Sequence, residues 1–219
     1  FRSPFICLFD SSNNYYVIDN NANIISKSFS AYSTIIAPIS GSNDSLIGSN
    51  ASFNYPNGIT YSTYDSALYV ADTYNSTIRK LTQDNTGSNY QVTTIAGFAG
   101  SNGSLNNSIG TNARFNNPMS LASYCNYLYV SDTYNNTLRQ IDISDINYPV
   151  TTIAGIAGST GYHDDTTGTN ATFNNLTAIT ILNSNIYIAD SGNDIIRKVS
   201  LGTPWPVTTI AAVSYTHLR

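Results

Sequence analysis

The sequence contains little charge. Only 10% of its 219 residues are charged, nine of them are Lys or Arg, and the formal net charge is −4. No cluster of Lys or Arg occurs anywhere along the chain. Nucleic acids and anionic membrane surfaces are recognised through such clusters. We therefore expect neither of them as a partner.

Cysteine and long apolar runs are also scarce. The two cysteines, Cys7 and Cys125, are too few for a disulfide framework, and we expect both to be free thiols. No apolar run approaches the roughly 20 residues that span a bilayer, so we expect no membrane insertion within this sequence. The compartment stays unassigned, because a chain that begins at Phe1 does not show whether a leader precedes it.

Hydrophobic and turn-forming residues are plentiful. The chain is 41% hydrophobic, with 17 Tyr and 14 Gly, and its polar residues are mainly Asn, Ser and Thr. This composition is typical of an ordered, β-rich globular protein and disfavours disorder.

One motif recurs along the chain. The stretch "LYVADTYNSTIRK" begins at Leu68, "LYVSDTYNNTLRQ" at Leu128 and "IYIADSGNDIIRK" at Ile186. The invariant acid moves from Asp72 to Asp132 and then to Asp190. A nearly fixed period of this size indicates a repeat architecture.

Each copy lies in a longer frame. The openings "FNYPNGIT", "FNNPMSLA" and "FNNLTAIT" begin at Phe53, Phe115 and Phe173, and the closing motif "VTTIAG" or "VTTIAA" ends each unit. A diverged fourth copy starts the chain, with "YYVIDNNANIISK" in place of the central motif. The sequence is therefore four units.

Within one unit, four short runs are rich in Val, Ile, Thr, Tyr and Leu and are separated by turn residues. In the second unit these runs cover residues 59–62, 67–72, 77–82 and 91–97. Apolar residues occupy both alternation phases, which suits strands covered on both faces. The sequence predicts an all-β fold of antiparallel four-stranded sheets stacked face to face, a β-propeller.

These motifs resemble the NHL repeat, and the resemblance covers nearly the whole chain. It implies a propeller that usually closes with six blades, of which the four units would form an arc. The expected blades cover approximately residues 1–38, 53–97, 115–155 and 173–212. The first blade has Ala22 and Ser26 where the second has Asn75 and Arg79, so we expect its central turn to differ.

The end of the chain matches no repeat. Residues 213–219, "VSYTHLR", resemble the translation of a transposase adapter used in making sequencing libraries, and we interpret them as a non-native tail. The residue before it, Ala212, stands where the other closing motifs have Gly97 and Gly155.

The central motif favours a structural role. Its acid ends one strand, its Asn lies in the turn, and its Arg is on the returning strand. We expect the carboxylate to accept turn N–H groups and to face the guanidinium across the hairpin. The residues of this turn motif are Asp72, Asn75, Arg79, Asp132, Asn135, Arg139, Asp190, Asn193 and Arg197.

The candidate binding residues lie at positions that vary between the units. Tyr74 and Tyr134 occupy a turn position that is Gly192 in the last unit, and exposed Tyr is a common binding anchor. Antiparallel order places this turn on the same rim as the long Gly-rich connections, which include Tyr162 and His163. We predict a non-catalytic binding or scaffold module whose rim takes a protein or other ligand.

Two chemical alternatives were weighed. The segment "YHDD" at residues 162–165 has metal-ligand chemistry, but a solvated loop is the favoured interpretation, and no metal or other cofactor is expected. The resemblance also extends to propeller enzymes of the gluconolactonase-like and amidating-lyase-like kinds, which hold a divalent metal in the central channel. The inner strands here offer neither acid nor histidine, so a metal-dependent enzyme remains the alternative only if its ligands lie in further blades.

Overall fold

The computed structural model describes residues 4–29, 32–37, 39–45, 47–87 and 89–212. Strands and short 3-10 helices make up all of its regular structure in these ranges. None of the helices in this part of the chain is long and apolar enough to cross a membrane. The tail expected at residues 213–219 lies outside the described residues.

Sixteen of the strands form four sheets, which we call blades 1 to 4. Blade 1 comprises β1 (Pro4–Phe9), β2 (Tyr15–Asp19), β3 (Ile24–Phe29) and β4 (Tyr32–Ala37). Blade 2 comprises β7 (Pro56–Ser62), β8 (Ala67–Asp72), β9 (Thr77–Gln83) and β10 (Tyr90–Gly97). Blade 3 comprises β11 (Pro118–Tyr124), β12 (Tyr127–Asp132), β13 (Thr137–Asp142) and β14 (Val150–Ala154). Blade 4 comprises β15 (Leu176–Leu182), β16 (Asn185–Asp190), β17 (Ile195–Ser200) and β18 (Val207–Ala212).

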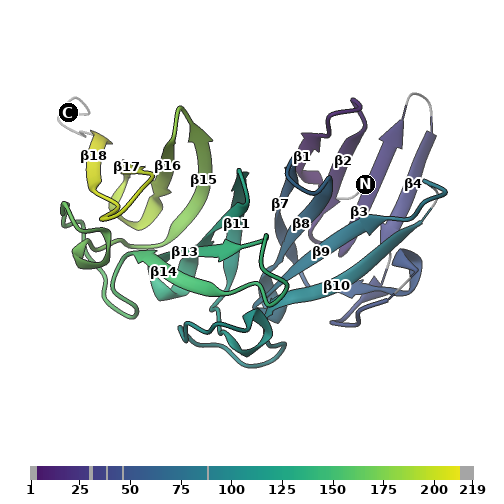
Figure 1. Ribbon diagram of the computed structural model, residues 1–219, viewed down its shortest axis with the longest axis horizontal. Helices are drawn as coiled ribbons and strands as arrows, with labels where there is room; N and C mark the ends of the chain where they lie inside the picture. Colours follow the sequence, from purple (N-terminus) through teal and green to yellow (C-terminus); the bar gives the residue numbers. More distant parts are fainter. Residues whose placement is uncertain (1–3, 30–31, 38, 46, 88, 213–219) are drawn as a thin grey trace, which may run out of the picture.

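Every blade is an antiparallel meander in which consecutive strands pair. The blades fan out as an arc, with their first strands β1, β7, β11 and β15 on the inner side and their last strands toward the outside (Figure 1). The prediction of an all-β propeller built of four-stranded antiparallel blades is thus confirmed.

The turn between the second and third strands is a 3-10 helix in three blades. These helices are η2 (Thr73–Asn75), η4 (Thr133–Asn135) and η6 (Ser191–Asn193), and each is followed by one left-handed residue that reverses the chain. In blade 1 the corresponding residues 20–23 form a plain turn. The expected difference in this turn is therefore present.

The connections between blades also share a short 3-10 helix. Each contains a short 3-10 helix, η1 (Gly48–Asn50), η3 (Gly110–Asn112) or η5 (Gly168–Asn170), whose buried first Gly packs against the preceding blade. A Cβ at Gly110 would lie 2.2 Å from the Ile95 carbonyl oxygen, so only Gly allows this close approach. The first connection also carries the two-residue strands β5 (Ile39–Ser40) and β6 (Ser52–Phe53).

The hydrophobic core is divided among the interfaces between blades. Each of three clusters combines one face of a blade with the opposite face of the next blade. Between blades 2 and 3, for example, Tyr69 and Ile78 pack with Leu128, Val130 and the fully buried Phe115. This explains why apolar residues occupy both phases of the strands. Cys7 and Cys125 are free and exposed, as predicted.

Candidate functional site

The rim that carries the 3-10 turns is built on a buried ion pair. In blades 2, 3 and 4 an Arg Nη1 donates to the Asp Oδ2 of the same hairpin, over 2.8, 2.7 and 3.0 Å. Both side chains of every pair are fully buried. The pairs are Asp72 with Arg79, Asp132 with Arg139, and Asp190 with Arg197.

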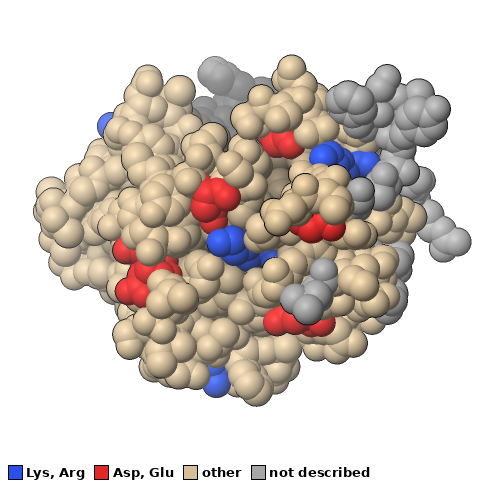
Figure 2. All heavy atoms as spheres, turned by 45° about the vertical axis from the view of Figure 1, so that its right-hand side comes forward, with Lys and Arg blue, Asp and Glu red and all other residues tan. Residues whose placement is uncertain are grey.

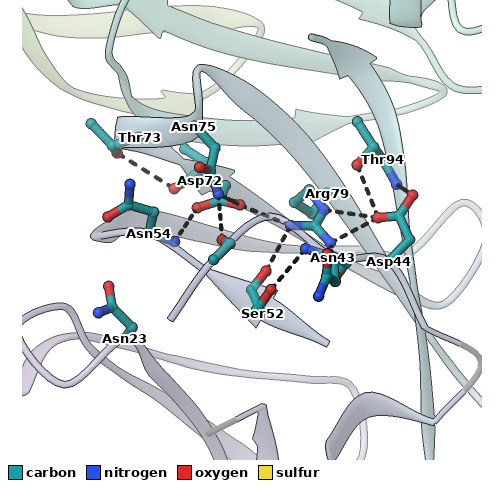
Figure 3. Close-up of polar contacts among 12 residues, drawn as sticks. Asn23, Asn43, Asp44, Ser52, Asn54, Asp72, Thr73, Asn75, Arg79 and Thr94 are labelled. Carbon is teal, nitrogen blue, oxygen red and sulfur yellow. Dashed lines mark hydrogen bonds and ion pairs between the residues drawn. The ribbon is translucent and has the colours of Figure 1, made fainter. Parts of the chain in front are cut away.

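The rest of the carboxylate is also hydrogen-bonded (Figure 3). Oδ2 of Asp72 accepts from Asn75 Nδ2 over 2.7 Å, and Oδ1 accepts the backbone N–H of Asn54 over 2.7 Å. One N–H donor is therefore the turn residue Asn75. The backbone donor lies outside the turn, in the segment that leads into the first strand, and Asp132 and Asp190 repeat this arrangement with Asn116 and Asn174.

The guanidinium extends the network into the connection between blades. Arg79 donates to the carbonyl oxygens of Ser52 and Asn43 and to Asp44 Oδ1, at 3.0, 2.8 and 2.7 Å (Figure 3). Its guanidinium carbon also lies 4.9 Å from the centroid of the Phe53 ring. Each connection is therefore held against its blade by one buried Arg.

The loop residue at the position of Asp44 varies little between repeats. Asn106 takes its place opposite Arg139, and Asp164 takes it opposite Arg197. Each of these three side chains also accepts a hydrogen bond from a Thr of the last strand in its blade. Sequence reasoning did not connect this loop residue with the Arg, because the loop residue lies 33 to 35 residues earlier in the chain, outside the hairpin that carries the motif.

Burial opposes ionisation of the paired acids. It raises the pKa of Asp72 and of Asp132 to about 6, although the facing Arg and the N–H donors act to lower the pKa. Burial likewise lowers the pKa of Arg139. Both carboxylates are still mostly ionised at neutral pH, so the pairs are charged there.

Blade 1 has no Arg at the corresponding position of its hairpin. Asp19 keeps the position of the acid and its Oδ1 accepts the N–H of Ala22 over 3.1 Å, but Ser26 stands in place of the Arg. Because each Arg binds the connection that precedes its own blade, the connection after blade 1 is held by Arg79 of blade 2, as the later ones are by Arg139 and Arg197.

The four candidate binding residues are exposed on this rim. Tyr74 and Tyr134 are 55% and 59% exposed on η2 and η4. Tyr162 and His163 are exposed in the connection before blade 4. That connection touches the turn that carries Tyr134, because the Gly158 N–H donates to the Asn135 carbonyl oxygen over 3.2 Å.

One aromatic residue was missed. Tyr55 stacks on Tyr74 with ring centroids 4.6 Å apart and an interplanar angle of 10°. Its φ of 53° lies in the left-handed region, where a bulky side chain is unusual. Blades 3 and 4 have Asn117 and Asn175 at the same position, so the signal was the change from "FNN" to "FNY".

Residues of the "YHDD" segment make polar contacts within the chain. Asp164 accepts from Arg197 over 2.7 Å and from the Thr209 N–H over 2.8 Å, and His163 Nε2 lies 3.5 Å from Asp165 Oδ2. Within the described ranges no three His, Cys, Asp or Glu side chains are grouped to hold a metal ion. The face of the molecule drawn in Figure 2 is largely uncharged, with acidic and basic groups scattered singly or in small clusters.

Known proteins resemble this chain in part. No model of a protein family matches the sequence. NHL repeat-containing protein 2 of Bos taurus is 34% identical over 99 residues, which are 44% of this chain and 13% of that protein. The similarity thus concerns the repeats and a small share of the relative.

Solved propellers share the fold at low sequence identity. An auxiliary nutrient binding protein from Bacteroides ovatus ATCC 8483 superposes with a TM-score of 0.71, at 19% identity, over 94% of this chain and 48% of that one. Virginiamycin B lyase from Staphylococcus aureus gives a TM-score of 0.62, at 14% identity, over 95% of this chain and 55% of that one. The chain spans about half the length of these structures. The repeated motifs, the four blades and the partial match to NHL repeat-containing protein 2 together show a β-propeller whose repeats are similar to NHL repeats.

Proposed function

We propose that the chain is a non-catalytic binding module whose rim of 3-10 turns and connecting loops takes a protein or other ligand. The observation that carries the proposal is the exposure of Tyr74 and Tyr134 on turns whose neighbouring Asp and Asn residues are buried and bonded. A rigid turn presents an aromatic side chain at little conformational cost, which is what a binding anchor requires.

Two further features support this use of the rim. The Tyr55 and Tyr74 rings form one stacked pair, so stacking on Tyr55 restricts the movement of the exposed Tyr74 ring. The fold is shared with an auxiliary nutrient binding protein, which supports binding only in general terms.

The arrangement of the blades is the second part of the proposal. We infer that the four blades are an arc of a larger ring, which the NHL resemblance sets at six blades. The support is the open arc in Figure 1, in which β1 and β18 lie at opposite ends of the row of blades.

The rim proposal is tested by removing the aromatic anchors. The Tyr74→Ala and Tyr134→Ala variants should melt within about 2 °C of the parent, because exposed side chains contribute little to stability. On peptide and glycan arrays, any ligand that the parent binds should lose at least about tenfold in affinity, the effect of an anchor worth about 1.4 kcal/mol or more.

Tyr64 provides the matched control. It is 54% exposed, as Tyr74 is, but lies in the turn between β7 and β8, at the opposite rim. Tyr64→Ala should leave array binding unchanged. If the Tyr74 and Tyr134 variants bind normally and melt early, these tyrosines are packing residues and the rim is not the site.

Metal binding by the segment at residues 162–165 has a direct test. Adding Ca²⁺, Zn²⁺ or a chelator should shift the melting temperature by less than about 1 °C, because only a ligand bound by the folded state stabilises it. A clear stabilisation by either metal that His163→Ala abolishes would support the metal site. Asp164→Ala is unsuitable for this test, since Asp164 also holds Arg197.

A further inference from the structure

The stacked pair of tyrosines on the rim of blade 2 requires an unfavourable backbone conformation. Tyr55 has a φ of 53°, in the left-handed region, which Asn adopts more readily than a bulky residue does. Blades 3 and 4 have Asn117 and Asn175 at this position, with φ of 54° and 57°. Of these three blades, only blade 2 places an aromatic ring there. Local strain of this kind is a common feature of binding sites.

The Tyr55 ring supports the Tyr74 ring from one side. The two rings are nearly parallel, with an interplanar angle of 10° and centroids 4.6 Å apart. Tyr55 is half-buried, whereas Tyr74 is 55% exposed. Because Tyr55 covers one face of the Tyr74 ring, the exposed area lies on the other face and the edge. We call this pair of residues the tyrosine platform.

The side chain at position 74 also changes the bonding of a neighbouring amide. In blade 4, Asn174 Nδ2 donates to the Gly192 carbonyl oxygen over 3.0 Å, and a Cβ at Gly192 would lie 2.5 Å from Asn174 Cγ. Tyr74 has such a Cβ, so its neighbour Asn54, the counterpart of Asn174, does not make this bond. The backbone N–H and carbonyl oxygen of Asn54 are bonded, but none of the described residues bonds its side-chain amide.

The turn of blade 1 supplies a second free amide near the platform. Asn23 Oδ1 accepts the Tyr55 N–H, and Asn20 Nδ2 donates to Asn57 Oδ1 over 3.0 Å. These two bonds hold the turn against the segment that carries Tyr55. Between them in the sequence lies Asn21, which is exposed.

The platform has no charged border. Three segments meet there and contain no Asp, Glu, Lys, Arg or His, namely residues 20–23, 54–56 and 73–76. The nearest acid in the sequence, Asp72, is fully buried and paired with Arg79. An ionic ligand would therefore find no opposite charge to pair with at this site.

A flat open ring beside free amides matches the chemistry of a neutral sugar. The C–H groups on one face of a pyranose ring stack on the negative face of an aromatic ring. The hydroxyl groups at the edge of the sugar both donate and accept, as a side-chain amide does. An apolar peptide side chain would cover the ring equally well, but it would leave the amides without partners.

We propose that the tyrosine platform binds a pyranose unit of a neutral oligosaccharide with equatorial ring substituents, such as β-1,4-linked glucose or N-acetylglucosamine. Equatorial substitution leaves only C–H groups on the two faces of the sugar ring, so one face lies flat on Tyr74. The amides of Asn54 and Asn21 bond its hydroxyl groups. The inference rests on the rim function proposed above and specifies the class of ligand for the part of the rim on blade 2.

The test is calorimetric titration of the chain with cellopentaose and with chitopentaose. At least one should bind with a dissociation constant of about 1 mM or below. Tyr74→Ala should weaken this binding at least about tenfold, and Asn54→Ala at least about threefold. Tyr64→Ala, on the opposite rim, should bind as the parent does.

Tyr55→Asn separates the platform from a merely structural role. The change introduces the residue that blades 3 and 4 have at this position. It should weaken saccharide binding at least about threefold because Tyr74 loses its support. The melting temperature should fall by no more than about 2 °C, because Asn adopts the left-handed conformation at lower cost. Early melting with unchanged saccharide binding would assign the pair to packing.

Two results would overturn the inference. One is no binding of either saccharide at about 10 mM, and the other is binding that Tyr74→Ala and Tyr55→Asn leave unchanged. The peptide array distinguishes this failure from failure of the rim function. Peptides that bind through Tyr74, without saccharide binding, would keep the rim as a binding surface and assign it to a protein partner. If neither peptides nor saccharides depend on Tyr74 or Tyr134, both proposals are wrong.

Discussion

Replacing Asp132 by Ala should lower the free energy of unfolding by about 3 to 5 kcal/mol, the usual cost of leaving one member of a buried ion pair alone. The change leaves the fully buried Arg139 without its 2.7 Å carboxylate partner. It also removes the acceptor for the Asn116 N–H and for Asn135 Nδ2. Denaturation by urea, followed by circular dichroism, measures the loss.

Two further variants isolate the ion pair. Asp132→Ala combined with Arg139→Met should cost less than the sum of the single changes, because the second change removes the unpaired charge. Asp145→Ala, in an exposed turn of the same blade, should cost less than about 1 kcal/mol. A loss below that value for Asp132→Ala as well would show that the pair does not stabilise the blade.

Replacing Phe115 by Ala should also lower the free energy of unfolding by about 3 to 5 kcal/mol, because it leaves a cavity where a fully buried ring was. The side chain packs between blades 2 and 3, and its ring centroid lies 4.9 Å from the guanidinium carbon of Arg139. Both the hydrophobic interface and the support of the ion pair are therefore weakened. Urea denaturation measures the loss, and hydrogen exchange should rise first in β10 and β11.

Phe98 is the control for this prediction. It is 57% exposed in the connection between the same two blades and lies 5.0 Å from the guanidinium carbon of Arg114. Phe98→Ala should cost less than about 1 kcal/mol, because little apolar area is lost from the interior. Equal losses for the two variants would contradict the role of Phe115 as the residue that joins the blades.

The Asp132 and Tyr134 variants together distinguish residues of one turn that stabilise the blade from residues that bind a ligand. Asp132 and Tyr134 are two residues apart, yet one is fully buried and the other is 59% exposed. This difference in burial follows from the 3-10 geometry of the turn, in which successive side chains point in different directions. Stability should therefore depend on Asp132 and binding on Tyr134.

The sequence alone determined the blades and their repeat. Alternating apolar residues specify strands, turn residues separate them, and three similar copies specify a stack, so β7 to β18 could be predicted from local pattern. The facing of Asp72 and Arg79 could also be predicted, because residues of one hairpin are neighbours in any antiparallel pairing.

Only the tertiary structure decided which distant groups meet. Arg79 reaches Asp44 in the preceding connection, Tyr55 stacks on Tyr74, and the backbone donor to Asp72 comes from Asn54. Each of these contacts joins a blade to the segment that precedes it, and no pattern within one pair of strands specifies such a contact. They arise only when one blade packs on the next. Local pattern specifies each blade, whereas packing between blades specifies the rim and its contacts.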